Sequence, residues 1–196
     1  MKGGRAVAEA DPRFHPETRA QWRAWLAEHH DDTLRVWVVT WKRATGRPAP
    51  SYDDLVEEAL CFGWVDSTAR TVDDERAEMR FTPRKPGSGW ARTNKVRIER
   101  LVADGQLAEP GLAVLRRAQE DGSWTLYDDV EALVVPPDLA AALDALPPAR
   151  ANFDAFPPSA RKQILAWVVT ARRAATREAR VREAAELARQ NVRANQ

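Results

Sequence analysis

The chain has 196 residues, with 30 Lys and Arg against 29 Asp and Glu, which gives a net charge of +1. Hydrophobic residues make up 44% and charged residues 30%, a balance typical of a soluble globular protein that excludes a disordered acidic or basic chain. The single cysteine excludes an intrachain disulfide and a structural zinc site built on a cysteine pair, and we predict no bound metal.

Residues 1–13 are rich in Gly, Ala and charge, and they contain no apolar run of the length that a secretory signal needs. They are therefore expected to form a frayed leader. No stretch of the chain approaches the ~18 apolar residues of a membrane helix, so no membrane insertion is expected. A cytoplasmic, reducing location is the corresponding prediction.

Residues 14–130 are predicted to form an α+β domain, in which a small antiparallel or mixed sheet packs with helices. The first strand carries apolar residues on both faces, which indicates that it lies inside the sheet. Ser51, ahead of two aspartates, is expected to cap the second helix. In chain order, the expected elements are a helix at Pro16–His30, a strand at Leu34–Trp41, a helix from Ser51 to about Phe62, hairpin strands at Trp64–Val72 and Arg76–Thr82, a loop at Pro83–Gly89, and helices ending near Gly105 and Gly122.

Residues 131–196 are predicted to form a helical C-terminal region. Three pairs of prolines divide it, and each pair is expected to lead into a helix. The last two expected helices span about Ser159–Arg173 and Thr176–Asn191.

The small net charge conceals four charged blocks. Residues 53–78 hold nine acids against two bases (−7), and residues 80–100 hold seven bases against one acid (+6). Residues 119–144 hold seven acids and no base (−7), and residues 161–193 hold nine bases against three acids (+6). One interpretation is that acidic and basic blocks face each other or are solvated. The other is that the two basic blocks converge on an anionic ligand.

The densest group of polar and aromatic residues lies at the hairpin and the loop that follows it. Glycines in this loop would let the backbone approach a ligand, and the next helix would offer free N–H groups to an anion. We predict a pocket walled by Trp64 and Trp90, in which Arg84 and Lys85 hold the anion. The predicted ligand-binding residues are Trp64, Ser67, Arg84, Lys85, Ser88, Trp90 and Asn94.

A structural interpretation of the same residues stays open, in which a basic loop caps a helix and the tryptophans fill the core. Walker and Rossmann glycine motifs are absent from the sequence, and no cofactor is predicted. Asp66 is the best candidate for a general acid or base, which makes an enzyme of unassigned reaction the alternative function. Asp66 would equally serve the structure by pairing with Arg84 or Arg80.

Long ordered motifs carry a resemblance to a known family. They are the segment Glu58–Ser67, the run Phe81–Lys85 with Ser88, Trp90 and Asn94, and the tail with Ser159, Thr176-Arg177 and Arg180-Val181. From about Phe14 to Leu187 the chain closely resembles the bacterial YdeI/OmpD-associated family. That family is named for bacteriocin protection and for association with an outer-membrane porin, and some members are linked to tolerance of cationic antimicrobial peptides.

The resemblance implies a role in antimicrobial-peptide or stress tolerance and brings no established reaction, cofactor or catalytic residue with it. Where the family usually has a second Ser after the motif Trp, this chain has Ala91. The predicted partner is a small anionic molecule or a peptide. A protein partner could use the C-terminal helices, where Arg173, Arg177 and Arg180 share a face that is either solvated or functional. The acidic blocks argue against nucleic acid.

Overall fold

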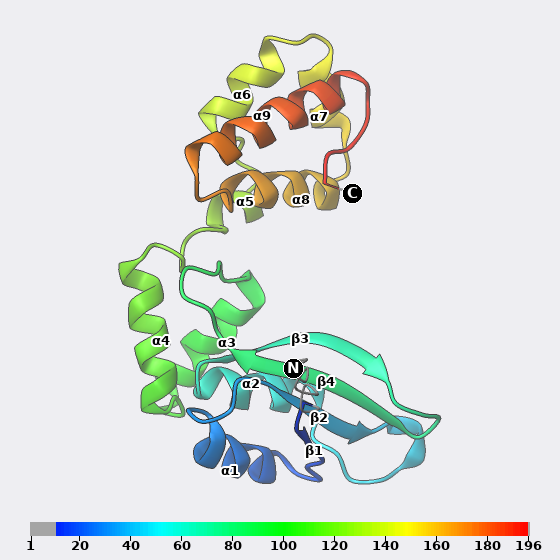
Figure 1. The fold of residues 1–196 in the computed structure, drawn as a ribbon, viewed down its shortest axis with the longest axis vertical. Helices are drawn as coiled ribbons and strands as arrows, with labels where there is room; N and C mark the ends of the chain where they lie inside the picture. The colour runs from blue at the N-terminus through cyan, green and yellow to red at the C-terminus, as the bar shows by residue number, and fades with distance from the viewer. Residues whose placement is uncertain (1–10, 196) are drawn as a thin grey trace, which may run out of the picture. The chain divides into compact units, whose positions relative to one another are not determined.

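The computed structural model describes residues 11–195 of the chain. These residues divide into two compact units. Unit 1 comprises residues 11–86 and 95–118, and unit 2 comprises residues 87–94 and 119–195. The predicted α+β class with a helical C-terminal region is confirmed, since unit 1 holds a mixed sheet and unit 2 is helical (Figure 1).

Unit 1 is built on a four-stranded sheet in the order β1-β2-β4-β3. The strands are β1 (Arg13–Phe14), β2 (Val36–Trp41), β3 (Trp64–Thr71) and β4 (Arg76–Pro83). The predicted hairpin forms, and its returning strand β4 inserts between β2 and β3 as an antiparallel partner of both. Strand β1, which pairs in parallel with β2, was not predicted. A strand of two residues is too short to show the alternation of apolar and polar residues that predicts a strand.

Helices α1 (Arg19–His29) and α2 (Tyr52–Cys61) lie on one side of this sheet (Figure 1). Trp22 of α1 is fully buried, and its ring lies tilted against that of Phe81 of β4, with the centroids 5.3 Å apart. Its indole N–H donates to the Leu55 carbonyl. As predicted, Ser51 caps α2, here in a capping box with Asp54. These contacts join the two helices to the central strand of the sheet.

Helices α3 (Arg92–Ala103) and α4 (Glu109–Glu120) follow the sheet. Gly111 of α4 lies where a β-carbon would come within 2.3 Å of the Cys61 carbonyl oxygen. Gly63, at the end of α2, has a φ of +74°, a conformation that suits glycine. The close approach of α4 to the end of α2 therefore depends on a residue without a side chain.

Unit 2 is a cluster of helices with its own core (Figure 1). The core is centred on fully buried Phe153 and on apolar residues of the helices around it. Three helices begin directly after the predicted proline pairs or within them, and α5 is a single turn that was not predicted. The helices are α5 (Asp128–Glu131), α6 (Pro137–Asp144), α7 (Ala149–Ala155), α8 (Pro158–Val169) and α9 (Ala174–Arg189).

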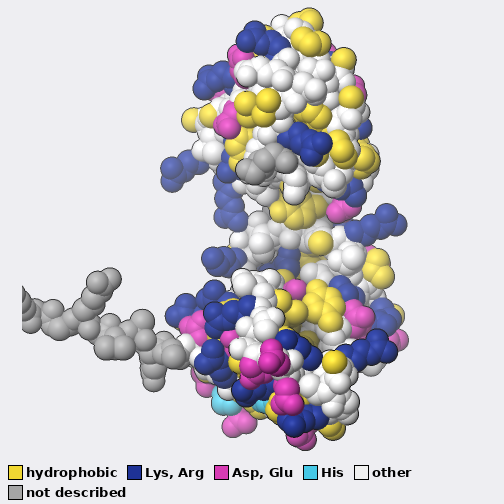
Figure 2. Space-filling model, turned by 90° about the vertical axis from the view of Figure 1, so that its right-hand side faces the viewer, with side chains coloured by type: hydrophobic (Ala, Val, Ile, Leu, Met, Phe, Trp, Pro, Cys, Tyr) yellow, Lys and Arg dark blue, Asp and Glu magenta, His cyan; other side chains and the backbone are white. Residues whose placement is uncertain are grey.

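Acidic and basic blocks pair within each unit. In unit 1, Arg97 and Arg100 of the basic block 80–100 pair with Asp53 and Glu57 of the acidic block 53–78. Glu57 and Glu58 also bind Arg19 and Arg23 of α1, which lie outside the blocks. In unit 2, Lys162 pairs with Glu131 and Arg177 with Asp138, both at 2.6 Å. These pairs agree with the interpretation in which acidic and basic blocks face each other. Figure 2 shows basic and acidic side chains interspersed over the sheet-containing unit.

The predicted leader is only partly described, because residues 1–10 lie outside the described range. Its last residue, Arg13, is the first residue of β1. Within residues 11–195, no helix combines the length and apolar character required to cross a membrane.

Candidate functional site

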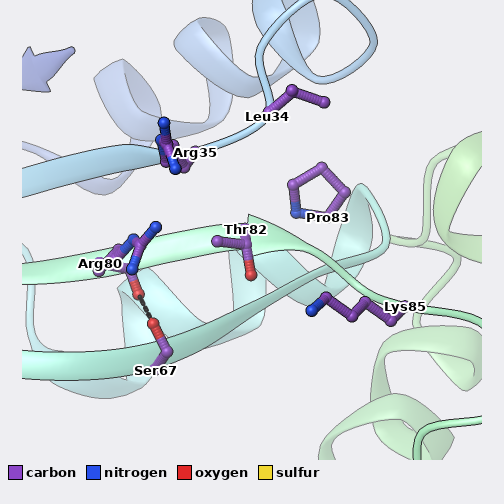
Figure 3. A pocket seen from close by; sticks show the side chains of 7 residues that line it. All are labelled: Leu34, Arg35, Ser67, Arg80, Thr82, Pro83 and Lys85. Atoms are coloured by element: carbon purple, nitrogen blue, oxygen red, sulfur yellow. Dashed lines mark hydrogen bonds between the residues drawn. The ribbon is translucent and has the colours of Figure 1, made fainter. Parts of the chain in front are cut away.

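A cavity of about 510 Å³ opens in unit 1 where β2, β3 and β4 come together (Figure 3). Two of its lining residues, Ser67 and Lys85, belong to the predicted ligand-binding set. The full lining is Leu34, Arg35, Ser67, Arg80, Thr82, Pro83 and Lys85. Three of these side chains are cationic and two carry hydroxyls, so the cavity has the donors that an anion requires.

Strand register explains why these residues meet. Val36 of β2 pairs with Phe81 of β4, so continuing this antiparallel register by one residue sets Arg35 opposite Thr82. On the other side of β4, Val65 pairs with Thr82, and the register shifts between Asp66 and Ala69. Ser67 lies inside this irregularity, is exposed, and donates its hydroxyl to the Arg80 carbonyl at 3.2 Å.

Two of the cations share one carboxylate. Asp11 forms a short ion pair with the Nε of Arg35, and its second oxygen lies 3.8 Å from the Nε of Arg80. The second distance is too long for a hydrogen bond. Among the described residues, this buried Nε of Arg80 has no hydrogen-bond acceptor. The two guanidiniums together carry two positive charges, and the carboxylate of Asp11 balances only one of them. The Nε–H of Arg80 is also left as an unsatisfied hydrogen-bond donor.

Trp64 is a core residue. Its side chain is 1% exposed, lies edge-on to Trp25 at 6.1 Å and donates its indole N–H to the His30 carbonyl. This corrects the prediction of Trp64 as a pocket wall, because a ring with almost no accessible surface has none to offer a ligand. The placement matches the open alternative in which tryptophans fill the core.

Trp90 and Ser88 belong to unit 2, in the segment 87–94. Trp90 is 2% exposed and packs against Trp124, with the two tilted rings 5.1 Å apart, so it too is corrected from pocket wall to core. Gly89 faces Tyr127, whose ring would lie 2.6 Å from an added β-carbon. The glycine was expected to let the backbone approach a ligand, but the ring of Tyr127 occupies the space beside it.

The other predicted site residues are spread over both units. Arg84 is 8% exposed and its backbone N–H donates to the Gly63 carbonyl, and the anion-binding role predicted for its side chain stays a prediction. Ser88 is half-buried, and Asn94, also half-buried, lies in the first turn of α3. Lys85 is exposed and lines the cavity of unit 1.

Asp66 lies against a tyrosine. Its carboxylate accepts the hydroxyl of Tyr52 at 3.1 Å. Desolvation, followed by the charge of Asp66, raises the pKa of Tyr52. Asp66 does not line the cavity, and its role as a general acid or base stays a prediction.

Sequence reasoning missed Arg35 and Thr82 as site residues and considered Arg80 only as a partner of Asp66. A signal existed for Arg80 and Thr82, because alternate residues of a strand point to one face. Nothing local distinguishes Arg35, which precedes β2 in the chain and reaches the cavity only through strand pairing.

Two of the three arginines singled out in the C-terminal helices make contacts within unit 2. Arg177 binds Asp138 through two hydrogen bonds, and Arg180 bonds to the Trp167 carbonyl while lying over the Trp167 ring. In the part of the chain that the structure describes, no group of three or more His, Cys, Asp or Glu side chains is arranged to hold a metal ion.

Comparison with known families gives two matches, one in each of the two parts of the chain. Residues 132–191 match the family described as bacteriocin-protection, YdeI or OmpD-associated. Residues 14–114, which include the cavity, match a family described only as a domain of unknown function (DUF8412). The resemblance predicted for nearly the whole chain is thus confirmed for its C-terminal part. Searches of curated proteins and of solved structures find no match.

Proposed function

The chain belongs to a domain family of unknown function, which matches residues 14–114, and its residues 132–191 match the bacteriocin-protection, YdeI or OmpD-associated family. From this premise we propose that the chain binds a small anionic molecule in the unit 1 cavity. The observation that carries the proposal is the convergence of Arg35, Arg80 and Lys85 on one cavity from separate segments of the chain.

The arginines favour an oxyanion as the ligand. A guanidinium presents planar N–H donors that match a carboxylate or a phosphate, and hydrogen bonds between charged partners are the stronger ones. The Nε of Arg80 is a donor in need of an acceptor, since Asp11 stays 3.8 Å away from it. An incoming anion would satisfy this donor and balance the charge that Asp11 leaves over.

The remaining lining sets the size and polarity of the ligand. Ser67 and Thr82 add hydroxyls beside the cations, and a volume of about 510 Å³ lies in the range of small-molecule sites. The cellular role that we propose is in antimicrobial-peptide or stress tolerance, in line with the family's description as bacteriocin-protection. A cytoplasmic location is part of this proposal.

The direct test is calorimetric titration of the full chain with inorganic phosphate. The variant Arg80→Gln should lower the affinity about tenfold or more, because it removes a charged hydrogen-bond donor at the cavity wall. Arg47→Gln is the matched control, since Arg47 lies over the Trp41 ring and pairs with Glu75 outside the cavity lining. An equal loss of phosphate affinity in both variants would mean that the effect comes from the overall charge of the protein, and it would contradict a binding site at Arg80.

Asp11 provides a second, opposite test. The Asp11→Asn variant should raise the affinity for phosphate by about two- to fivefold, because a partly exposed carboxylate no longer competes for Arg35 and Arg80. The gain should shrink as salt is added, since salt screens exposed charges. Unchanged affinity at low salt would contradict the idea that the anion shares these two guanidiniums with Asp11.

A further inference from the structure

The apolar part of the cavity lining is as distinctive as its charges. Leu34 is 82% exposed, more than any other large hydrophobic side chain identified as exposed in the described residues. It lines the cavity together with Pro83 of β4. An isolated exposed leucine needs no explanation, but this one stands beside a basic cavity that has a second apolar wall.

The apolar side chains and the two arginines occupy different ends of the site. In the close-up, Leu34 and Pro83 lie at one end, with Lys85 on the side of Pro83, while Arg35 and Arg80 lie at the other end (Figure 3). A simple oxyanion bound by the two arginines would leave the apolar end uncovered. A ligand that covers both ends must carry a negative group and an apolar group within one molecule.

We propose that the cavity selects an amphiphilic anion, a single short alkyl chain that bears a phosphate or carboxylate, with the anion at Arg35 and Arg80 and the chain against Leu34 and Pro83. This inference rests on the proposed function, because it assigns a ligand class to the same cavity. Charge complementarity commits it to an anionic ligand, since two guanidiniums share the single carboxylate of Asp11. Covering Leu34 on binding removes apolar surface from water, which is favourable.

The test compares hexyl phosphate with inorganic phosphate and hexanol, each titrated calorimetrically into the full chain below the concentration at which hexyl phosphate forms micelles. Hexyl phosphate should bind about tenfold tighter than phosphate, because several methylene groups leave water. Hexanol should bind more weakly than hexyl phosphate, because it lacks the charge. Equal affinities for hexanol and hexyl phosphate would overturn the anionic part of the inference.

Leu34→Ser isolates the apolar part. Its exposure means that the substitution removes no core packing, so the fold should persist. The variant should bind phosphate as the parent chain does and should lose most of the preference for hexyl phosphate. Val96→Ser is the matched control, because Val96 is an exposed apolar residue of unit 1 outside the cavity lining, 58% exposed. A full preference retained in Leu34→Ser would overturn the inference.

The outcomes separate the inference from the proposed function. Equal binding of phosphate and hexyl phosphate would overturn the amphiphile and leave the anion site standing. Failure of both to bind would overturn the proposed function itself. If the chain binds vesicles of an anionic phospholipid but not hexyl phosphate, the inference of a soluble amphiphile is overturned, and the ligand is a membrane surface.

Discussion

The carboxylate of Glu78 lies on the sheet face opposite α1 and α2, where it is 3% exposed. It accepts hydrogen bonds from the Nε atoms of Arg13 at 2.9 Å and Arg70 at 2.7 Å. Arg70 also lies 4.0 Å over the Trp37 ring. A buried carboxylate is tolerated when it is paired in this way, and here it ties β1 and β3 to the central strand β4.

These hydrogen bonds make the stability of unit 1 dependent on pH. The hydrogen bond from Arg13 is the main cause of a lowered pKa at Glu78, opposed by desolvation and supported by Arg70. A glutamate carboxyl in the unfolded chain titrates near 4.5. Because the folded pKa lies below that value, the contribution is fully present above it and is lost as the pH falls through the folded pKa.

Glu78→Gln should therefore lower the free energy of unfolding by about 1–2 kcal/mol at neutral pH, a figure reduced by the exposure of both arginines. The difference between the parent chain and the variant should vanish in acid. Denaturant unfolding at several pH values measures it, with exposed Glu75→Gln as the control. A loss that is the same at every pH would contradict an electrostatic origin.

At the scale of elements, the packing of α4 against the end of α2 depends on glycine. A β-carbon at Gly111 would meet the Cys61 carbonyl oxygen at 2.3 Å and its carbonyl carbon at 2.8 Å. Both are backbone atoms, so neither can rotate away. The amide of Ala108 also donates to the Cys61 carbonyl, at 3.1 Å, which holds the two segments at this distance.

Gly111→Ala should lower the free energy of unfolding by about 2 kcal/mol or more, because the overpacking forces the helices apart. Alanine has the better helix propensity, so the sign of the change separates packing from propensity. Ala113→Ser, at an exposed position of α4, is the control and should change stability by less than about 0.5 kcal/mol. An increase in stability for Gly111→Ala would refute the close approach.

At the scale of the whole molecule, the chain has a separate core for each unit. The core of unit 2 surrounds Phe153, which is fully buried and lies 6.2 Å from Phe156. Unit 1 buries Trp22 and Leu26 of α1 together with Phe81 of β4. A substitution in one core is therefore expected to act first on its own unit.

Phe153→Ala should lower the free energy of unfolding of unit 2 by about 3–5 kcal/mol, because it leaves a cavity in the core. Amide hydrogen exchange should quicken in α6, α7, α8 and α9 while β2 and β4 keep their protection. Leu26→Ala is the reciprocal control and should quicken exchange in unit 1. Equal acceleration throughout the chain for Phe153→Ala would show one cooperative unit instead of two.

Local patterns in the sequence were sufficient for most elements and for part of the site. Capping by Ser51, the hairpin of β3 and β4, and helices after the proline pairs all follow from residues close together in the chain. Ser67 and Lys85, both predicted as ligand-binding residues from the sequence, line the cavity, and their ligand-binding role stays a prediction. Strand β1 was missed, since its two residues are fixed only by their partner β2.

Tertiary structure decided the burial and the register. Whether Trp64 and Trp90 face solvent or core depends on residues distant in sequence, namely Trp25 and Trp124, so no local pattern separates a pocket wall from a core ring. Likewise, Arg35 reaches Arg80 only because β4 inserts beside β2 in one register. The sequence alone determined the class of fold, whereas long-range packing and strand pairing determined which side chains are buried and which cations meet.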